Sequence, residues 1–124
     1  MGMEHRVQIP SGTPVSWSAI RQVLSEVGEK PVLRMIDAEL AFPDELPPEE
    51  WTELRIALSG GMVTLRRHSE SVACITWGNA DEALTDSWNK ACWAVATATQ
   101  GAIVSTLGEL SADEFGVQHS IVSI

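Results

Sequence analysis

Apolar and polar residues alternate through the middle of the chain, between residues 53 and 77. Leu54, Ile56 and Leu58 are each separated by one charged or small residue. This is the two-residue period of a strand with one buried face. After a short glycine pair, Val63 and Leu65 continue the same alternation. The pattern predicts a hairpin whose apolar positions all lie on one face.

The glycine pair Gly60-Gly61 favours a two-residue turn, because such turns need backbone angles that glycine adopts easily. A turn centred on this pair fixes the register of the hairpin, which a slip of one residue would invert. The expected cross-strand pairs are Leu58 with Val63, Ile56 with Leu65 and Arg55 with Arg66.

A third strand follows at residues 72–77, after the polar stretch 68–71. Its residues are apolar at nearly every position, which is typical of a central strand buried on both faces. The pattern leaves open which face points inward, and the order of strands in the sheet. Residues 53–77 are therefore predicted to form the central meander of a mostly antiparallel sheet.

Two longer stretches have the spacing of amphipathic helices, at about residues 14–27 and 82–100. In the first, Thr13 is expected to cap the helix with Pro14 in the first turn. In the second, Asp81 suits the N-terminus and Gly101 suits the C-terminus. Shorter elements are expected at residues 6–9, 31–36 and 102–107 as strands, 111–115 as a capped helical turn, and 117–124 as a last strand.

These elements predict the α+β class: one two-layer domain over residues 1–124, with both main helices on one face of the sheet. The formal net charge of −9 argues against nucleic-acid binding and against anionic membranes, because both require a basic surface. It is compatible with a basic protein partner. No apolar run approaches the roughly 20 residues of a membrane-spanning helix, and we expect a cytoplasmic protein.

The stretch from residue 37 to residue 53, called here the acidic segment, carries seven acidic residues and no basic one. Glu49 and Glu50 are two adjacent acids near its end. More than a dozen residues between strands is long for a compact domain, and long loops are often functional. One interpretation is an inhibitor-type surface that neutralises a basic partner. The alternative is a solvated connection without a binding role.

Candidate chemistry is sparse. The three histidines are not spaced along the chain as metal ligands are. Cys74 and Cys92 are interpreted as buried free thiols. No nucleophile motif or phosphate-binding loop is present. We therefore expect a non-catalytic binding or interaction protein without cofactor or metal. A small enzyme or small-ligand binder remains the alternative. It would use Arg55, Arg66 and the loop carboxylates, among which Asp37, Glu39 and Glu53 lie close to strands.

Basic side chains are expected to gather on the outer face of the hairpin. In the register above, Arg55 and Arg66 oppose each other, with Arg67 at the next position. Like charges directly opposite are destabilising. Either nearby acids such as Glu53 and Glu70 or a bound anion should offset them, and guanidinium groups suit carboxylate or phosphate.

Two tryptophans are the remaining candidate binding residues. Trp93 falls off the apolar stripe of its predicted helix, and Trp51 leads out of the acidic segment. An exposed tryptophan is a candidate interface anchor, although packing against a neighbouring loop is an equal alternative. Together with the apolar end of the chain, Trp93 favours a homodimer.

Overall fold

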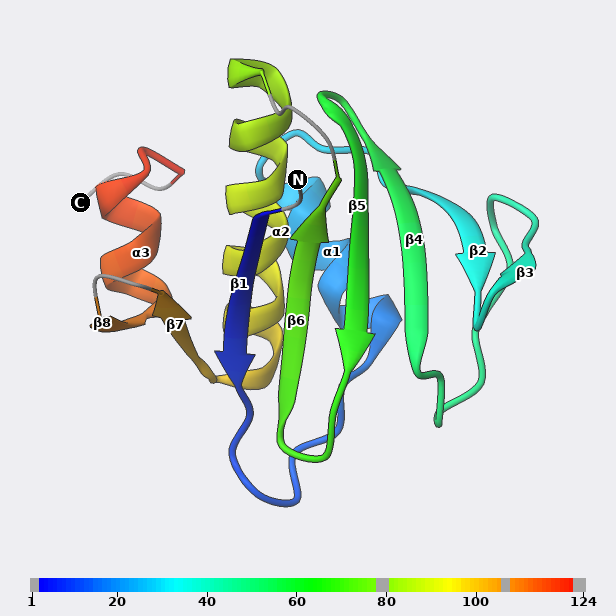
Figure 1. The fold of residues 1–124 in the computed structure, drawn as a ribbon, viewed down its shortest axis with the longest axis horizontal. Coiled ribbons are helices and arrows are strands. Elements are labelled where there is room, and N and C mark those ends of the chain that lie inside the picture. The colour runs from blue at the N-terminus through cyan, green and yellow to red at the C-terminus, as the bar shows by residue number, and fades with distance from the viewer. Residues whose placement is uncertain (1–2, 78–80, 106–107, 122–124) are drawn as a thin grey trace.

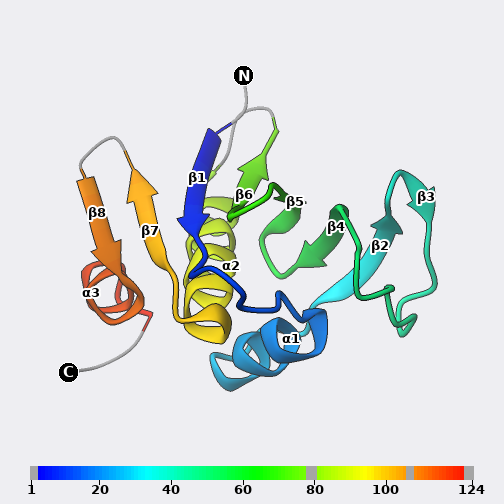
Figure 2. The ribbon, with the colours of Figure 1, turned by 90° about the horizontal axis from the view of Figure 1, so that it is seen from below.

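The computed structural model describes residues 3–77, 81–105 and 108–121. In these ranges eight strands form one antiparallel sheet, and three helices lie on one side of it (Figures 1 and 2), which confirms the predicted α+β class. The strand order is β3-β2-β4-β5-β6-β1-β7-β8. The strands are β1 (Met3–Gln8), β2 (Val32–Ile36), β3 (Glu39–Leu40), β4 (Glu53–Leu58), β5 (Gly61–Arg67), β6 (Ser71–Thr76), β7 (Ala102–Ser105) and β8 (Gly108–Ser111).

The central meander β4-β5-β6 forms as predicted, but the register of its first hairpin differs. The turn is centred on Ser59 and Gly60, so Leu58 pairs with Gly61 and Ile56 pairs with Val63. The register is therefore shifted by two residues from the expected one. Because the side-chain period of a strand is also two, the shift leaves every apolar residue on the predicted face.

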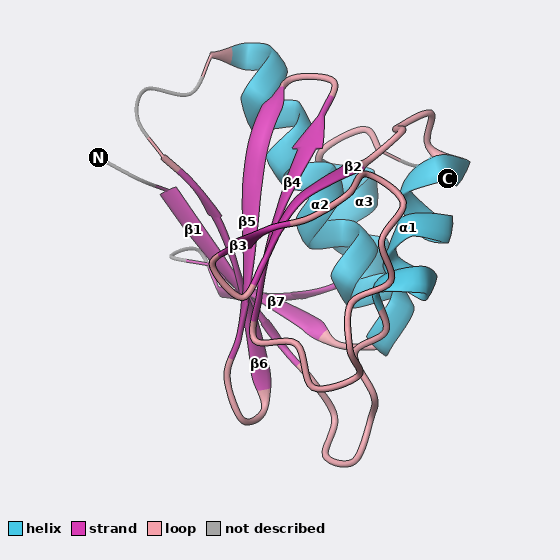
Figure 3. Cartoon of the chain, turned by 90° about the vertical axis from the view of Figure 1, so that its right-hand side faces the viewer, coloured by secondary structure: helices cyan, strands magenta, loops and turns pink. Residues whose placement is uncertain are grey.

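Strand β6 lies inside the sheet between β5 and β1, and all its residues are buried. Val72 and Cys74 belong to the hydrophobic core between sheet and helices. By alternation, Ala73 and Ile75 lie on the face that no helix covers. Figure 3 shows the helices on one side of the strands.

Helix α2 (Glu82–Thr99) packs against β1, β5, β6 and β7 and forms the centre of the helical layer. Asp81 caps it, as predicted, by accepting a hydrogen bond from the Leu84 N–H. At the other end Gln100, one residue before Gly101, is the C-cap and takes the left-handed conformation. Gly101 is needed for space, since a Cβ there would collide with the Gln8 carbonyl.

Helix α1 (Trp17–Glu26) packs on α2, and it begins three residues later than predicted. Its cap is Ser16, whose hydroxyl accepts a hydrogen bond from the Ala19 N–H, and not Thr13. The apolar residues Trp17, Ile20 and Leu24 are buried, so the predicted stripe is confirmed.

The C-terminal region differs most from the prediction. Ser111 and Glu114 form the expected capping box, but helix α3 (Ala112–Gln118) continues past Phe115. The last strand predicted from residue 117 is therefore wrong for residues 117–121, which are the end of α3 and the turn after it, and residues 122–124 lie outside the described ranges. No helix in the described ranges is long and apolar enough to cross a membrane.

Candidate functional site

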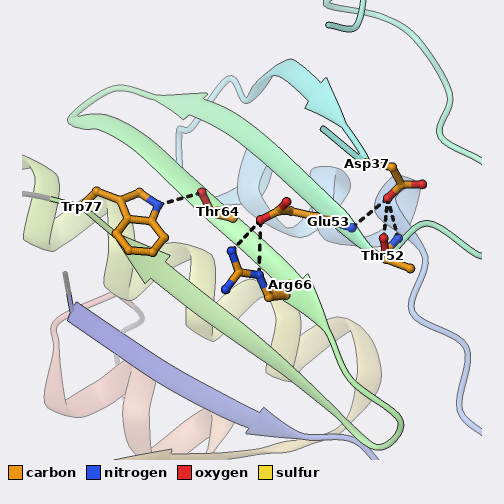
Figure 4. Close-up of polar contacts among 6 residues, drawn as sticks. All are labelled: Asp37, Thr52, Glu53, Thr64, Arg66 and Trp77. Carbon is orange, nitrogen blue, oxygen red and sulfur yellow. Dashed lines mark hydrogen bonds and ion pairs between the residues drawn. The ribbon is translucent and has the colours of Figure 1, made fainter. Parts of the chain in front are cut away.

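The acidic segment is closed at its base by Asp37. One carboxylate oxygen, Oδ1, accepts hydrogen bonds from the Thr52 N–H at 2.7 Å, the Thr52 hydroxyl at 2.8 Å and the Glu53 N–H at 2.9 Å (Figure 4). The two backbone N–H donors are the main reason that the pKa of Asp37 lies below its ordinary value. Asp37 thus holds the two ends of the segment together.

The segment begins with a tight turn into the edge strand β3. Asp37 and Ala38 both have positive φ, 50° and 70°, and Ile36 pairs with Glu39 across them. Beyond this turn three large apolar side chains face solvent. Leu40 is 88% exposed, Phe42 is 75% exposed and Leu46 is 69% exposed. These are the three most exposed large hydrophobic residues in the described part of the chain.

Acidic side chains surround these apolar ones. Asp44, Glu45, Glu49 and Glu50 are exposed, and within the described ranges none forms an ion pair with a basic side chain. Glu45 instead accepts a hydrogen bond from the Phe42 N–H at 3.1 Å, and its own N–H donates to the Phe42 carbonyl at 3.0 Å. This reciprocal contact holds a turn with Phe42 at its start.

At its far end the segment is anchored by Trp51 and Arg67. Trp51 is 2% exposed, so it fills the core and does not form an exposed anchor. The Arg67 guanidinium lies 5.0 Å from the centre of the Trp51 ring. Its Nη1 donates to the carbonyls of Glu49 at 2.8 Å and of Trp51 at 3.1 Å. The structure therefore brings Trp51, Glu49 and Arg67 together, as the sequence could not show.

The predicted opposition of Arg55 and Arg66 is wrong. In the observed register Arg55 pairs with Thr64, while Arg66 pairs with Glu53. The Arg66 guanidinium contacts the Glu53 carboxylate at 2.8 Å (Figure 4), so the acid expected to offset the basic charge does so. On the same open face the Trp77 indole N–H donates to the Thr64 hydroxyl at 3.4 Å, and Trp77 is 55% exposed.

Trp93 lies in the hydrophobic core and is 6% exposed. Its position off the predicted stripe has a simple reason: α2 is buried on several sides, between the sheet, α1 and α3. Trp93 is thus packed against its own chain and cannot anchor a partner in this conformation. The homodimer loses this support and stays a prediction.

Sequence reasoning missed the apolar residues of the acidic segment, because they have neither helical nor strand periodicity. The sequence does place them among prolines and acidic residues, in a segment without any pattern that predicts burial. It also missed Glu29, a carboxylate only 2% exposed. Glu29 accepts hydrogen bonds from the Ser59 N–H at 2.9 Å and the Ser59 hydroxyl at 2.7 Å, and Lys90 lies 3.8 Å away. These contacts join the connection between α1 and β2 to the hairpin turn and to α2.

A second polar cluster lies between β1, α2 and α3. The His5 ring stacks on Trp88 at 4.0 Å and meets Phe115 edge-on at 5.6 Å. Asn89 contacts Nδ1 of His119 at 3.3 Å. Burial, and then the nearby charge of His119, lower the pKa of His5, although contact with Asn89 opposes this. The surroundings of His5 therefore favour its neutral imidazole.

Within the described residues, no three His, Cys, Asp or Glu side chains gather in a way that could hold a metal ion. Cys74 and Cys92 are buried free thiols, and burial raises the pKa of Cys92 well above its ordinary value. Comparison of the chain with protein families, curated proteins and solved structures found no match. The geometry of the chain itself is thus the basis for any functional assignment.

Proposed function

We propose that the protein is a non-catalytic interaction domain that binds a basic protein partner through the acidic segment, residues 37–53. One observation carries this proposal: Leu40, Phe42 and Leu46 are 88%, 75% and 69% exposed within a few residues of one another. Scattered apolar side chains on a surface are ordinary, but neighbouring large ones commonly mark interaction sites. Aromatic residues such as Phe42 are enriched in interfaces.

Charge complementarity supports a basic partner. Acids flank the apolar residues on both sides, and the protein as a whole carries a formal net charge of −9. Unpaired surface carboxylates attract a basic surface at long range and speed association. Apolar contact then supplies affinity by burying area. An inhibitor that covers a basic site on another protein is one form of this function.

The segment is held in shape before any partner arrives. Asp37 closes its base, Arg67 and the buried Trp51 fix its far end, and Glu45 holds the turn at Phe42. A pre-ordered loop loses less conformational entropy when it binds than a disordered one does. The fixed ends therefore favour a binding role over that of a loose connection.

Site-specific cross-linking in the source cells tests the proposal. A photoreactive phenylalanine analogue replaces Phe42 in one variant and Trp77 in a control variant. Trp77 is also an exposed aromatic residue, but it lies on the open face of the sheet. We expect position 42, and not position 77, to cross-link a protein of high isoelectric point.

Reversing the charge of Asp44 and Glu45 in the same protein should abolish that cross-link. A cross-link to a second copy of the chain would identify the apolar residues as a homodimer interface and overturn the assignment of a basic partner. Absence of a position-specific product, or one that survives charge reversal, would also contradict the proposal.

A further inference from the structure

A pocket of about 490 Å³ lies between the start of α1 and the last part of the acidic segment. Its walls combine apolar and polar side chains. They come from residues 14–18 at the start of α1, from residues 46–49 and Trp51, and from Arg67 at the end of β5. Concave sites of this size with few polar groups are the usual form of small-ligand sites.

Arg67 brings to this pocket a guanidinium group that forms no ion pair with a carboxylate in the described ranges. Its hydrogen bonds go to the backbone carbonyls of Glu49 and Trp51, and the Trp51 ring lies beneath it. These contacts fix the guanidinium in place without neutralising it.

The N-terminus of α1 adds to the positive electrostatic potential that Arg67 gives the pocket. The first N–H groups of a helix have no partner within the helix, and its dipole is positive at this end. Helices often place Asp or Glu in the first turn, but α1 has none there. Ser16 and Ser18, which line the pocket, bring hydroxyl groups to it.

Trp51 forms a buried wall of the pocket. This side chain lines the pocket and is 2% exposed, and its indole N–H has no acceptor in the described part of the chain. A buried donor without an acceptor costs about 1–3 kcal/mol.

We propose that this pocket binds a carboxylate that is attached to an apolar group. Val15, Leu46, Pro47 and Pro48 provide the apolar walls. Arg67 and the start of α1 receive the negative charge, as guanidinium groups and helix N-termini commonly do. The exposed Glu49 is the one acid among the lining residues, and it favours a singly charged carboxylate over a phosphate dianion. The site goes beyond the proposed binding of a basic partner and does not depend on it.

Two kinds of ligand carry a carboxylate next to an apolar group: a free organic acid and the C-terminus of a peptide. Phenylacetate represents the first and phenylacetamide is its neutral control. A short peptide with a free C-terminal leucine represents the second, with its C-terminal amide as control. Binding is followed by the indole N–H signals in ¹H–¹⁵N spectra of the folded protein. We expect a saturable shift of the Trp51 signal with at least one carboxylate and not with its amide.

Two variants make the test decisive. Arg67→Gln should weaken carboxylate binding at least tenfold, whereas Arg66→Gln, which removes the same charge from the open face, should not. Because Arg67 also holds two carbonyls, its variant risks unfolding. Ser18→Glu is therefore a second test that leaves Arg67 in place. An acid in the first turn stabilises a helix, but it repels an anion bound nearby.

The relative affinity of the two probes identifies the source of the ligand. No saturable shift at millimolar concentration, equal binding of acid and amide, or undiminished binding by Ser18→Glu would overturn the proposal.

Discussion

Gly60 lies directly against the Ala83 backbone at the start of α2. A Cβ added to Gly60 would overlap the carbonyl carbon and oxygen of Ala83. The hairpin turn and the helix therefore meet backbone to backbone, and Ser87 reinforces the contact by accepting a hydrogen bond from the Gly60 N–H at 2.9 Å. This contact places Gly60 inside the turn and Gly61 at the start of β5.

Gly60→Ala should destabilise the protein by about 3 kcal/mol, because a carbonyl group cannot move aside as a flexible side chain can. Gly12→Ala is the matched control. Gly12 has a φ of 81° but open space around it, so its variant should lose about 1 kcal/mol through backbone strain alone. Urea unfolding measures both. Equal losses in the two variants would show that the contact with Ala83 is not tight.

The Gly60 contact also explains what the sequence could and could not predict about this hairpin. Alternation placed Leu54, Ile56 and Leu58 on the core face, and the structure confirms this. The register depends on which glycine enters the turn, and that choice is decided by a helix more than twenty residues later in the chain. A local pattern with a period of two cannot distinguish registers two residues apart.

Asp37→Asn should lower the free energy of unfolding by about 1 kcal/mol at neutral pH, since three hydrogen bonds lose a charged acceptor. The pKa of Asp37 is lowered in the folded protein from an ordinary value of 3.8. Its stabilisation is therefore complete above that value and is lost as the pH falls through the lowered folded pKa.

The difference between wild type and Asp37→Asn should accordingly shrink in acid. Urea unfolding across the acidic range checks this trend. Asp44→Asn is the control, because Asp44 has no hydrogen bond or ion pair in the described ranges, and it should match the wild type. A difference between wild type and Asp37→Asn that does not change with pH would contradict the role given to the Asp37 charge.

His5→Phe tests the cluster between β1, α2 and α3. The pKa of His5 is lowered by burial and by His119, so below its ordinary value of 6.5 the unfolded chain binds more protons than the folded one. The wild type should therefore lose stability as the pH falls from 6.5 toward the lowered pKa. Phenylalanine retains a ring against Trp88 but cannot take up a proton.

We expect thermal unfolding of His5→Phe to depend less on pH in this range than that of the wild type. His68→Gln, which replaces an exposed histidine outside the cluster, is the matched control. An unchanged dependence in His5→Phe would mean that His5 titrates normally in the folded protein.

The candidate site was less predictable than the fold. The acids of the acidic segment were visible in the sequence, as was the basic group at Arg67. The exposure of Phe42 was not, because an apolar residue without periodicity gives no sign of whether it is buried. Trp93 shows the opposite case: it lies off the stripe of an amphipathic helix, yet α2 is covered on several sides and buries it.

The affinity of the purified partner that cross-links at position 42 tests the central proposal most directly. Calorimetric titration would compare wild type with Phe42→Ser and with Met62→Ser, which removes an apolar residue 38% exposed on another strand. We expect Phe42→Ser to weaken binding at least tenfold, or about 1.4 kcal/mol, and added salt to weaken it further. Met62→Ser should bind as the wild type does. Equal affinities for all three proteins, or binding that is insensitive to salt, would contradict the assignment of the acidic segment as a surface for a basic partner.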